Sequence, residues 1–398
     1  CLYPIGTADD GFSELPKLAK KVVYLDQLCI SSMMKGLHPA IPAERRAQHS
    51  IWRELFERLE RASKLQLVVC PASSFHSSES YVYTHAASLN RMYKYFSGDC
   101  SFGDPGYIKQ SQLLQHANNW MSGAPSKELA LDRREALDGS LDAWQGRIRV
   151  GVQPHFDPDL ADGLRRDRDA LSERFSNTFS RWRQQGRRRF VDWYGAELSG
   201  WWTCIRNDFQ RELAVFAEVQ SGRRPIDLES CFPSFGRMLL QYVLLPAFPK
   251  KYGDGQATAL IGEYRACTEL EPVHFLRVSS LLLAALARRA SGGQLRPPNR
   301  GMVNDINMVS VLMPYCDAIF VDNEMQTMLA EPDVAKRLNV SARIFSPRLI
   351  GEFFKYLEAI CAAADKTHLN AVRAIYGDTW LTPYSELFAD ERSNSSPT

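Results

Sequence analysis

The segment Val22-Val23-Tyr24-Leu25-Asp26 reveals more about the architecture of this chain than any other. Four apolar residues rich in β-formers end at an acid, which is typical of a buried parallel strand that delivers a polar group at its tip. Downstream, residues 51–62 carry apolar side chains at helical spacing, and residues 67–70 form a second apolar run. Ser73 then suits the start of a helix that runs through Glu79. This alternation predicts βαβ units.

The same alternation returns near the carboxyl end of the chain. Apolar spacing and β-former content predict, in order, a helix, a strand, a helix, a strand and a closing helix. Their ranges are 303–313, 318–321, 324–330, 342–345 and 348–363. Together the two alternating regions predict an α/β fold with a small parallel sheet.

Residues 98–293, which separate these regions, have a different character, since strand signals nearly vanish apart from residues 147–150. Charged and aromatic helical patterns dominate instead. Helices are expected at 160–175, 179–202 and 207–219, and around Met238 and Leu282. Gly292-Gly293 and Pro297-Pro298 mark the exit from this region.

We therefore predict an α/β domain that is interrupted by a large, mostly α-helical insertion. The predicted parts are residues 1–97 and 294–392 for the α/β domain, 98–293 for the insertion and 393–398 for a disordered tail. The tail is polar and has nothing to bury.

Composition restricts the kinds of partner that the chain can have. The 398 residues carry 48 Lys plus Arg against 46 Asp plus Glu, so no strong overall field steers the molecule toward polyanions. The nine cysteines include no Cys-x-x-Cys pair or close Cys/His group of the kind that zinc sites use, and their odd, scattered set suggests a reducing interior. No apolar run approaches the ~18 to 20 residues that cross a bilayer. We expect a cytoplasmic protein that does not bind membranes.

Three acids occupy equivalent places in the predicted fold, since Asp26 and Asp322 directly follow strands and Glu79 lies in the helix after the second strand. A fourth acid, Asp305, lies early in the helix before the strand at 318–321 and would begin close to the same edge of the sheet. Loops at the carboxyl ends of parallel strands converge over one edge, so these side chains are expected to meet. Converging carboxylates need a cation to offset their repulsion, and Mg²⁺ or Mn²⁺ prefers oxygen ligands. Each acid taken alone could equally be a helix cap or a solvated charge.

These segments resemble PIN-domain nucleases in order and spacing. Val22-Val23-Tyr24-Leu25-Asp26 looks like the family's first strand and first metal-binding acid, and Cys70-Pro71-Ala72-Ser73-Ser74-Phe75-His76-Ser77-Ser78-Glu79 is similar to its second strand, helix and second acid. Asn304-Asp305-Ile306-Asn307 and Ala318-Ile319-Phe320-Val321-Asp322 resemble the segments that carry the third and fourth acids. Tyr24-Leu25-Asp26-Gln27 and Pro314-Tyr315-Cys316-Asp317 look like a longer bacterial subgroup of the family. One departure is Gln27-Leu28, which stands where many members have a small hydroxyl residue and Asn.

The resemblance implies a three-layer PIN-like fold and an endonuclease that acts on nucleic acid, with RNA favoured over DNA as the substrate. Asp26, Glu79, Asp305 and Asp322 would be both the catalytic residues and the ligands of Mg²⁺ or Mn²⁺. A toxin or antiviral defence role is compatible with this activity, as is a homo-oligomer or a regulatory protein partner bound through the insertion.

Three further features have a functional and a structural interpretation. Asp317 is expected at the opposite edge of the sheet, as a turn acid, and His76 shares a helical face with Glu79 but is more often a packed residue. The residues proposed to bind nucleic acid form a run interleaved with aromatic rings: Arg181, Arg183, Arg187, Arg188 and Arg189. The structural interpretation is an amphipathic helix whose rings face a core while its cations face water, and it is favoured.

Two other functions fit parts of the pattern. One is a catalytically inactive PIN-like scaffold that binds RNA or protein. The other is a phosphatase of the haloacid-dehalogenase type, which also begins with a strand ending in Asp; it usually needs a second Asp two positions later, where this chain has Leu28.

Overall fold

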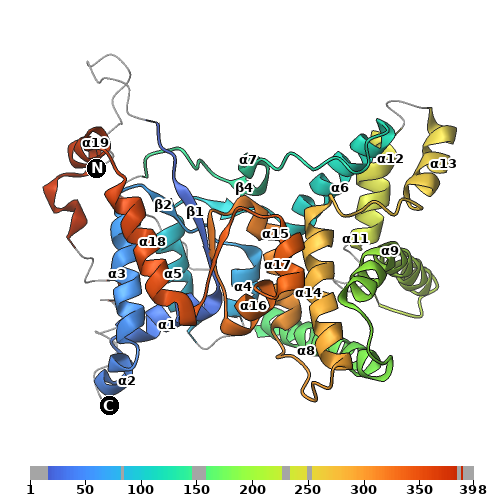
Figure 1. Cartoon of the computed structure of the whole chain (residues 1–398), viewed down its shortest axis with the longest axis horizontal. Coiled ribbons are helices and arrows are strands. Elements are labelled where there is room, and N and C mark those ends of the chain that lie inside the picture. Colours follow the sequence, from blue (N-terminus) through green and yellow to red (C-terminus); the bar gives the residue numbers. More distant parts are fainter. Residues whose placement is uncertain are drawn as a thin grey trace.

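A computed structural model describes residues 17–81, 85–145, 158–225, 234–248, 253–382 and 387–388. The chain is a mixed α/β protein in which a small sheet lies between two layers of helices (Figure 1). The predicted strand at 147–150 and the predicted tail at 393–398 fall outside the described residues.

The central sheet has four strands in the order β2-β1-β5-β6, and every neighbouring pair is parallel. The strands are β1 (Lys21–Leu25), β2 (Val68–Val69), β5 (Ala318–Phe320) and β6 (Arg343–Phe345). Each lies where a strand was predicted, so the expected α/β class and the small parallel sheet are confirmed. β3 (Ser101–Phe102) and β4 (Leu137–Asp138) form a separate antiparallel ribbon that was not expected.

Burial on both faces explains why the strands consist of uninterrupted apolar residues. Val23 and Leu25 of β1 belong to one hydrophobic cluster, whereas Val22 and Tyr24 belong to the other. Successive side chains of a strand point to opposite faces, so each helical layer receives every second residue.

The first helical layer covers the face that carries Val23 and Leu25. Apolar side chains of four helices pack there, among them Met33, Phe56 and Phe353. These helices are α1 (Gln27–Leu37), α3 (Ser50–Lys64), α5 (Ala86–Ser97) and α18 (Ile350–Ala362), with the short α2 (Ala43–Ala47) connecting α1 to α3. Beyond them, α19 (Lys366–Tyr376) packs Val372 and Tyr376 against Leu65.

The second layer covers the face that carries Val22 and Tyr24. Its helices are α6 (Pro105–Met121), α14 (His274–Ser291), α15 (Met302–Leu312), α16 (Asn323–Leu329) and α17 (Pro332–Leu338).

Other short helical elements connect these parts of the molecule. They are α4 (Ser74–Tyr81), α7 (Arg133–Ala136), α11 (Phe235–Arg237), the π-helical turn η1 (Met238–Leu244), α12 (Leu245–Ala247), α13 (Asp254–Tyr264), and the 3₁₀ turns η2 (Met313–Tyr315), η3 (Pro347–Leu349) and η4 (Asp378–Leu381).

Two long helices replace the three that were predicted between residues 160 and 219. They are α8 (Pro158–Gln184) and α9 (Phe190–Gln220), and both pack against α14. The predicted breaks near residues 176–178 and 203–206 are wrong, because the backbone continues as helix through both. The chain turns instead at Gly186, whose φ of 72° lies in the left-handed region that glycine adopts without strain.

The predicted insertion shares a hydrophobic core with the sheet. One cluster of buried residues runs from Tyr24 of β1 through Ile306 of α15 and Leu282 of α14 to Trp193 of α9. This continuity means that the sheet and the long helices bury apolar surface against each other rather than in two separate cores.

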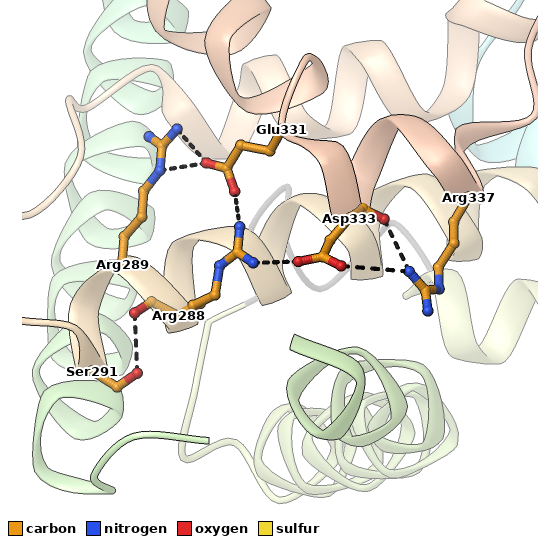
Figure 2. Close-up of polar contacts among 6 residues, drawn as sticks. All are labelled: Arg288, Arg289, Ser291, Glu331, Asp333 and Arg337. Atoms are coloured by element: carbon orange, nitrogen blue, oxygen red, sulfur yellow. Dashed lines mark hydrogen bonds and ion pairs between the residues drawn. The ribbon is translucent and has the colours of Figure 1, made fainter. Parts of the chain in front are cut away.

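An ion-pair network joins α14 to α17 within the second helical layer (Figure 2). Glu331, which precedes α17, accepts hydrogen bonds from Arg288 and from Nε of Arg289 at 2.8 Å. Arg288 also donates to Oδ2 of Asp333 at 2.5 Å and lies 5.1 Å from the ring centre of Phe190 at the start of α9. Three helices that are distant in sequence therefore meet at one group of charges.

No helix within the described parts of the chain combines the length and the apolar character that a membrane crossing requires.

Candidate functional site

The carboxyl ends of β1 and β5 form the topological switch point of the sheet. From β1 the chain crosses to β2 on one side, whereas from β5 it crosses to β6 on the other. The two connections diverge there, and in open α/β sheets this is the place where ligands usually bind. Side chains that directly follow β1 and β5 therefore lie at the same edge of the sheet.

Asp26 is the first of these side chains. Its backbone N–H donates to the carbonyl of Phe320 at 2.9 Å, which extends the β1–β5 pairing by one residue. The residue is partly buried. Desolvation of its carboxyl group and the negative charge of Asp322 raise the pKa of Asp26 from 3.8 to about 6, and hydrogen bonds from the backbone N–H groups of Gln27 and Leu28 offset part of this rise. Asp26 therefore ionises in a place that already carries negative charge.

Asp322 is the partner of Asp26 across the switch point. It follows Val321, which continues β5 by donating its N–H to the carbonyl of Phe345 at 2.9 Å. Oδ1 of Asp322 accepts the N–H of Met325 at 2.7 Å and so caps the amino end of α16. One carboxylate can cap a helix with one oxygen and coordinate a cation with the other.

Glu324 extends this group of acids and was not singled out from the sequence. It lies in the first turn of α16, and both burial and the charge of Asp322 raise its pKa, while Arg289 opposes the rise. The signal that could have found it is an acid two positions after a strand-ending Asp, which falls within one helical turn of the same edge.

Asp305 and Glu79 lie on elements that begin at this edge. Asp305 is in the first turn of α15, its N–H donates to the carbonyl of Gly301 at 3.0 Å, and its side chain is partly buried. Glu79 lies in α4, which follows β2, but its side chain falls outside the described residues. The structure thus brings Asp26 and Asp322 together and leaves the joining of the other two acids as a prediction. Among the described side chains, no three His, Cys, Asp or Glu residues are grouped as metal ligands.

His76 packs against β1 and hydrogen-bonds to the last residue of that strand. Its ring is buried and stacked on Tyr24 and Tyr93, with ring centres 4.7 and 4.2 Å apart. Nε2 lies 2.8 Å from the carbonyl oxygen of Leu25, and because a carbonyl can only accept, Nε2 carries the proton. Burial lowers the pKa of His76 to about 4 despite this hydrogen bond. His76 is a neutral packing residue that fixes the backbone next to Asp26.

Asp317 lies at the opposite edge, as predicted. It precedes β5, and its carboxylate accepts from the N–H of Val22 at 2.9 Å and from Lys21 and Arg133 at 3.1 and 2.8 Å. Burial raises the pKa of Asp317, but these three partners more than offset that effect, so its pKa is lowered overall. Its role is to pair with neighbouring cations.

In the arginine-rich run the cations face water and the aromatic rings pack in the core, which is the arrangement that the structural interpretation predicted. Its five arginines are exposed, whereas the aromatic residues Trp182, Phe190, Trp193 and Tyr194 are buried in the core. Arg189 pairs with Asp192, and Arg188 lies over the ring of Trp193 at 5.1 Å. The rings are therefore occupied in packing and do not offer faces for stacking on bases, which leaves these arginines a purely electrostatic contribution to nucleic-acid binding.

Lys109 of α6 is the second residue that sequence reasoning missed. Its Nζ donates to Oδ1 of Asn307 at 2.5 Å and lies 5.7 Å from the ring centre of Phe275. Burial lowers the pKa of Lys109 to about 8, although Asp104 opposes this. No local pattern in the sequence marks this lysine, because its partners come from α15 and α14.

Comparison with protein-family models, with curated proteins and with solved structures found no significant match to this chain.

Proposed function

We propose that the chain is a metal-dependent endonuclease of the PIN-like kind that hydrolyses phosphodiester bonds in RNA. One observation carries the proposal: Asp26 and Asp322 stand together at the switch point, and their mutual repulsion contributes to the raised pKa of Asp26. Carboxylate oxygens are the ligands that Mg²⁺ and Mn²⁺ prefer, and a bound cation would relieve this excess of negative charge.

In this proposal Asp26 and Asp322 hold the ion, and Glu79 and Asp305 complete its ligands from α4 and α15. Such an ion, when bound, polarises a phosphodiester and lowers the pKa of a coordinated water. The chain itself contributes rigid placement: Asp322 is oriented by the cap that it forms on α16, and the Leu25 carbonyl is held by His76. Above pH about 6 Asp26 is ionised and able to bind a cation.

A non-catalytic scaffold of the same PIN-like kind is the second candidate, and the cap formed by Asp322 favours it. An acid that caps α16 has a structural role that does not depend on a metal. In that case the long helices would provide the surface that binds RNA or a protein partner.

Cleavage of a single-stranded RNA in the presence of Mg²⁺ or Mn²⁺ tests the proposal. Asp26→Asn and Asp322→Asn are expected to reduce the cleavage rate by about a hundredfold or more, because several kcal/mol of charge stabilisation would be lost. A chelator should abolish cleavage by the unaltered protein.

Asp365→Asn is the matched control. Asp365 is an exposed acid that caps α19 through the N–H of His368 at 2.7 Å, and Asn can keep that cap. The control should cleave at the normal rate. Equal cleavage by Asp26→Asn and Asp365→Asn would overturn the proposal in favour of a contaminating nuclease or a site elsewhere.

A further inference from the structure

A cavity of about 460 Å³ opens next to the elements that carry the candidate acids. We call it the asparagine pocket; it is lined by Ser74, Phe75, Asp104, Pro105, Gly106, Lys109, Phe235, Met238, Asn304 and Asn307. Asn304 directly precedes Asp305 on α15, and Ser74 and Phe75 begin α4, the helix that contains Glu79. A group bound in this pocket would therefore lie next to the two helices that carry Glu79 and Asp305, two of the proposed metal ligands.

The charges in the pocket nearly cancel. Lys109 provides one cation, and Asp104 provides one anion that is fixed in place because Oδ1 of Asp104 accepts the N–H of Tyr107 at 3.0 Å and caps α6. A phosphate in the pocket would be repelled by Asp104 about as strongly as it is attracted by Lys109. A neutral ligand fits this balance better than an anion.

The walls combine aromatic side chains with amide groups. Phe75 and Phe235 are partly buried, pack against the hydrophobic core and also line the pocket. Asn307 has a defined orientation, since the ammonium group of Lys109 can only donate and therefore faces Oδ1. The NH₂ group of Asn307 is left as the donor for a ligand, and Asn304 adds a second amide.

Rings for stacking together with amides for hydrogen bonding are the means by which proteins recognise unpaired bases. Building on the proposed endonuclease function, we propose that the asparagine pocket holds one unpaired base of the strand being cleaved, stacked on Phe235 and hydrogen-bonded by Asn304 and Asn307. Phe235 and Met238 belong to the predicted insertion, so that region would contribute to the choice of substrate.

Binding of short single-stranded RNA, followed by fluorescence anisotropy in EDTA so that no metal-dependent cleavage occurs, tests this inference. The comparison ligand is a chain of the same length in which every nucleotide is a stable abasic spacer, so that the phosphates remain and the bases are removed. The unaltered protein should bind the base-bearing RNA about tenfold more tightly than the abasic chain. Asn304→Ala and Phe235→Ala should remove most of that preference and leave binding of the abasic chain unchanged.

Asn118→Ala is the matched control, because Asn118 is an exposed asparagine on α6, the helix that carries Lys109. It should keep the preference, and circular dichroism melts should show that all three variants fold. Equal affinity of the unaltered protein for the two chains, or no binding of either, would overturn the inference.

The outcome is separable from that of the proposed function when cleavage is measured in parallel with Mn²⁺. A protein that prefers base-bearing RNA without cleaving it would support the pocket and refute the endonuclease. A protein that cleaves RNA while showing no preference for bases would do the reverse.

Discussion

At the scale of single residues, Asp26 illustrates how a candidate site can oppose the stability of the fold around it. The carboxyl group is partly buried beside Asp322, and both features favour its neutral form. The same charge that disfavours folding would attract a divalent cation, so the two effects have one origin.

The pH dependence of stability follows from this raised pKa. Between pH about 4 and about 6 the folded protein holds the Asp26 proton more tightly than the unfolded chain, so stability should fall as the pH rises through this window and remain lower above it. Asp26→Asn cannot ionise and should remove that loss, which we expect to be on the order of 1–3 kcal/mol in the absence of metal. Urea unfolding of both proteins at several pH values measures it. A variant that is less stable than the unaltered protein at pH about 8 would contradict the raised pKa of Asp26.

At the scale of elements, the tips of β1 and β5 and the start of α16 act together. Asp322 has two separable properties, a cap on α16 and a negative charge near Asp26. Asn can keep the cap without the charge, whereas Ala loses both.

Substitutions of Asp322 can therefore separate structure from chemistry. Asp322→Ala should cost about 1 kcal/mol of stability through the lost cap, while Asp322→Asn should be at least as stable as the unaltered protein. Both should lower the pKa of Asp26, because both remove the neighbouring charge. Thermal unfolding and an NMR titration of the Asp26 carboxyl group measure the two effects. Equal destabilisation by both substitutions would show that Asn does not keep the cap.

The strands could be predicted because each is a short run of apolar residues buried on both faces, and the runs before Asp26 and Asp322 also fixed the places of these acids. The break between α8 and α9 could not be predicted, because Gly186 is one of several positions in this polar region where a helix could end. The environment of Lys109 and its pocket could not be predicted either. Asn307 lies 198 positions from Lys109 in the chain, and no local pattern reports such a contact.

At the scale of the whole molecule, the long helices share a hydrophobic core with the sheet and do not form a separate unit with a core of their own. The network of Arg288, Arg289, Glu331 and Asp333 adds ion pairs to this packing (Figure 2). Glu331 is the centre of the network, since it accepts from both arginines and its side chain is 15% exposed. The hydrophobic patterning of residues 98–293 predicted helices there but carried no information about the surface on which they pack.

Glu331→Gln tests the importance of this junction. Removing the charge takes an anionic partner from two partly buried guanidinium groups, of which Arg288 keeps Asp333, so we expect a loss of about 1–3 kcal/mol in the free energy of unfolding. Glu352→Gln is the comparison, because Glu352 forms an exposed pair with Lys355 whose loss should leave the free energy of unfolding nearly unchanged. Urea unfolding measures both. Similar values for the two variants would mean that the junction depends on apolar packing alone.

Calorimetric titration with Mn²⁺ at a pH above about 7, where Asp26 is ionised, probes the metal site itself. The unaltered protein and Asp365→Asn should bind the ion with the same affinity. Asp26→Asn should bind it more than about tenfold more weakly, a loss that is typical even for residues that merely orient metal ligands. Unchanged Mn²⁺ affinity in Asp26→Asn would contradict a metal site at the ends of β1 and β5.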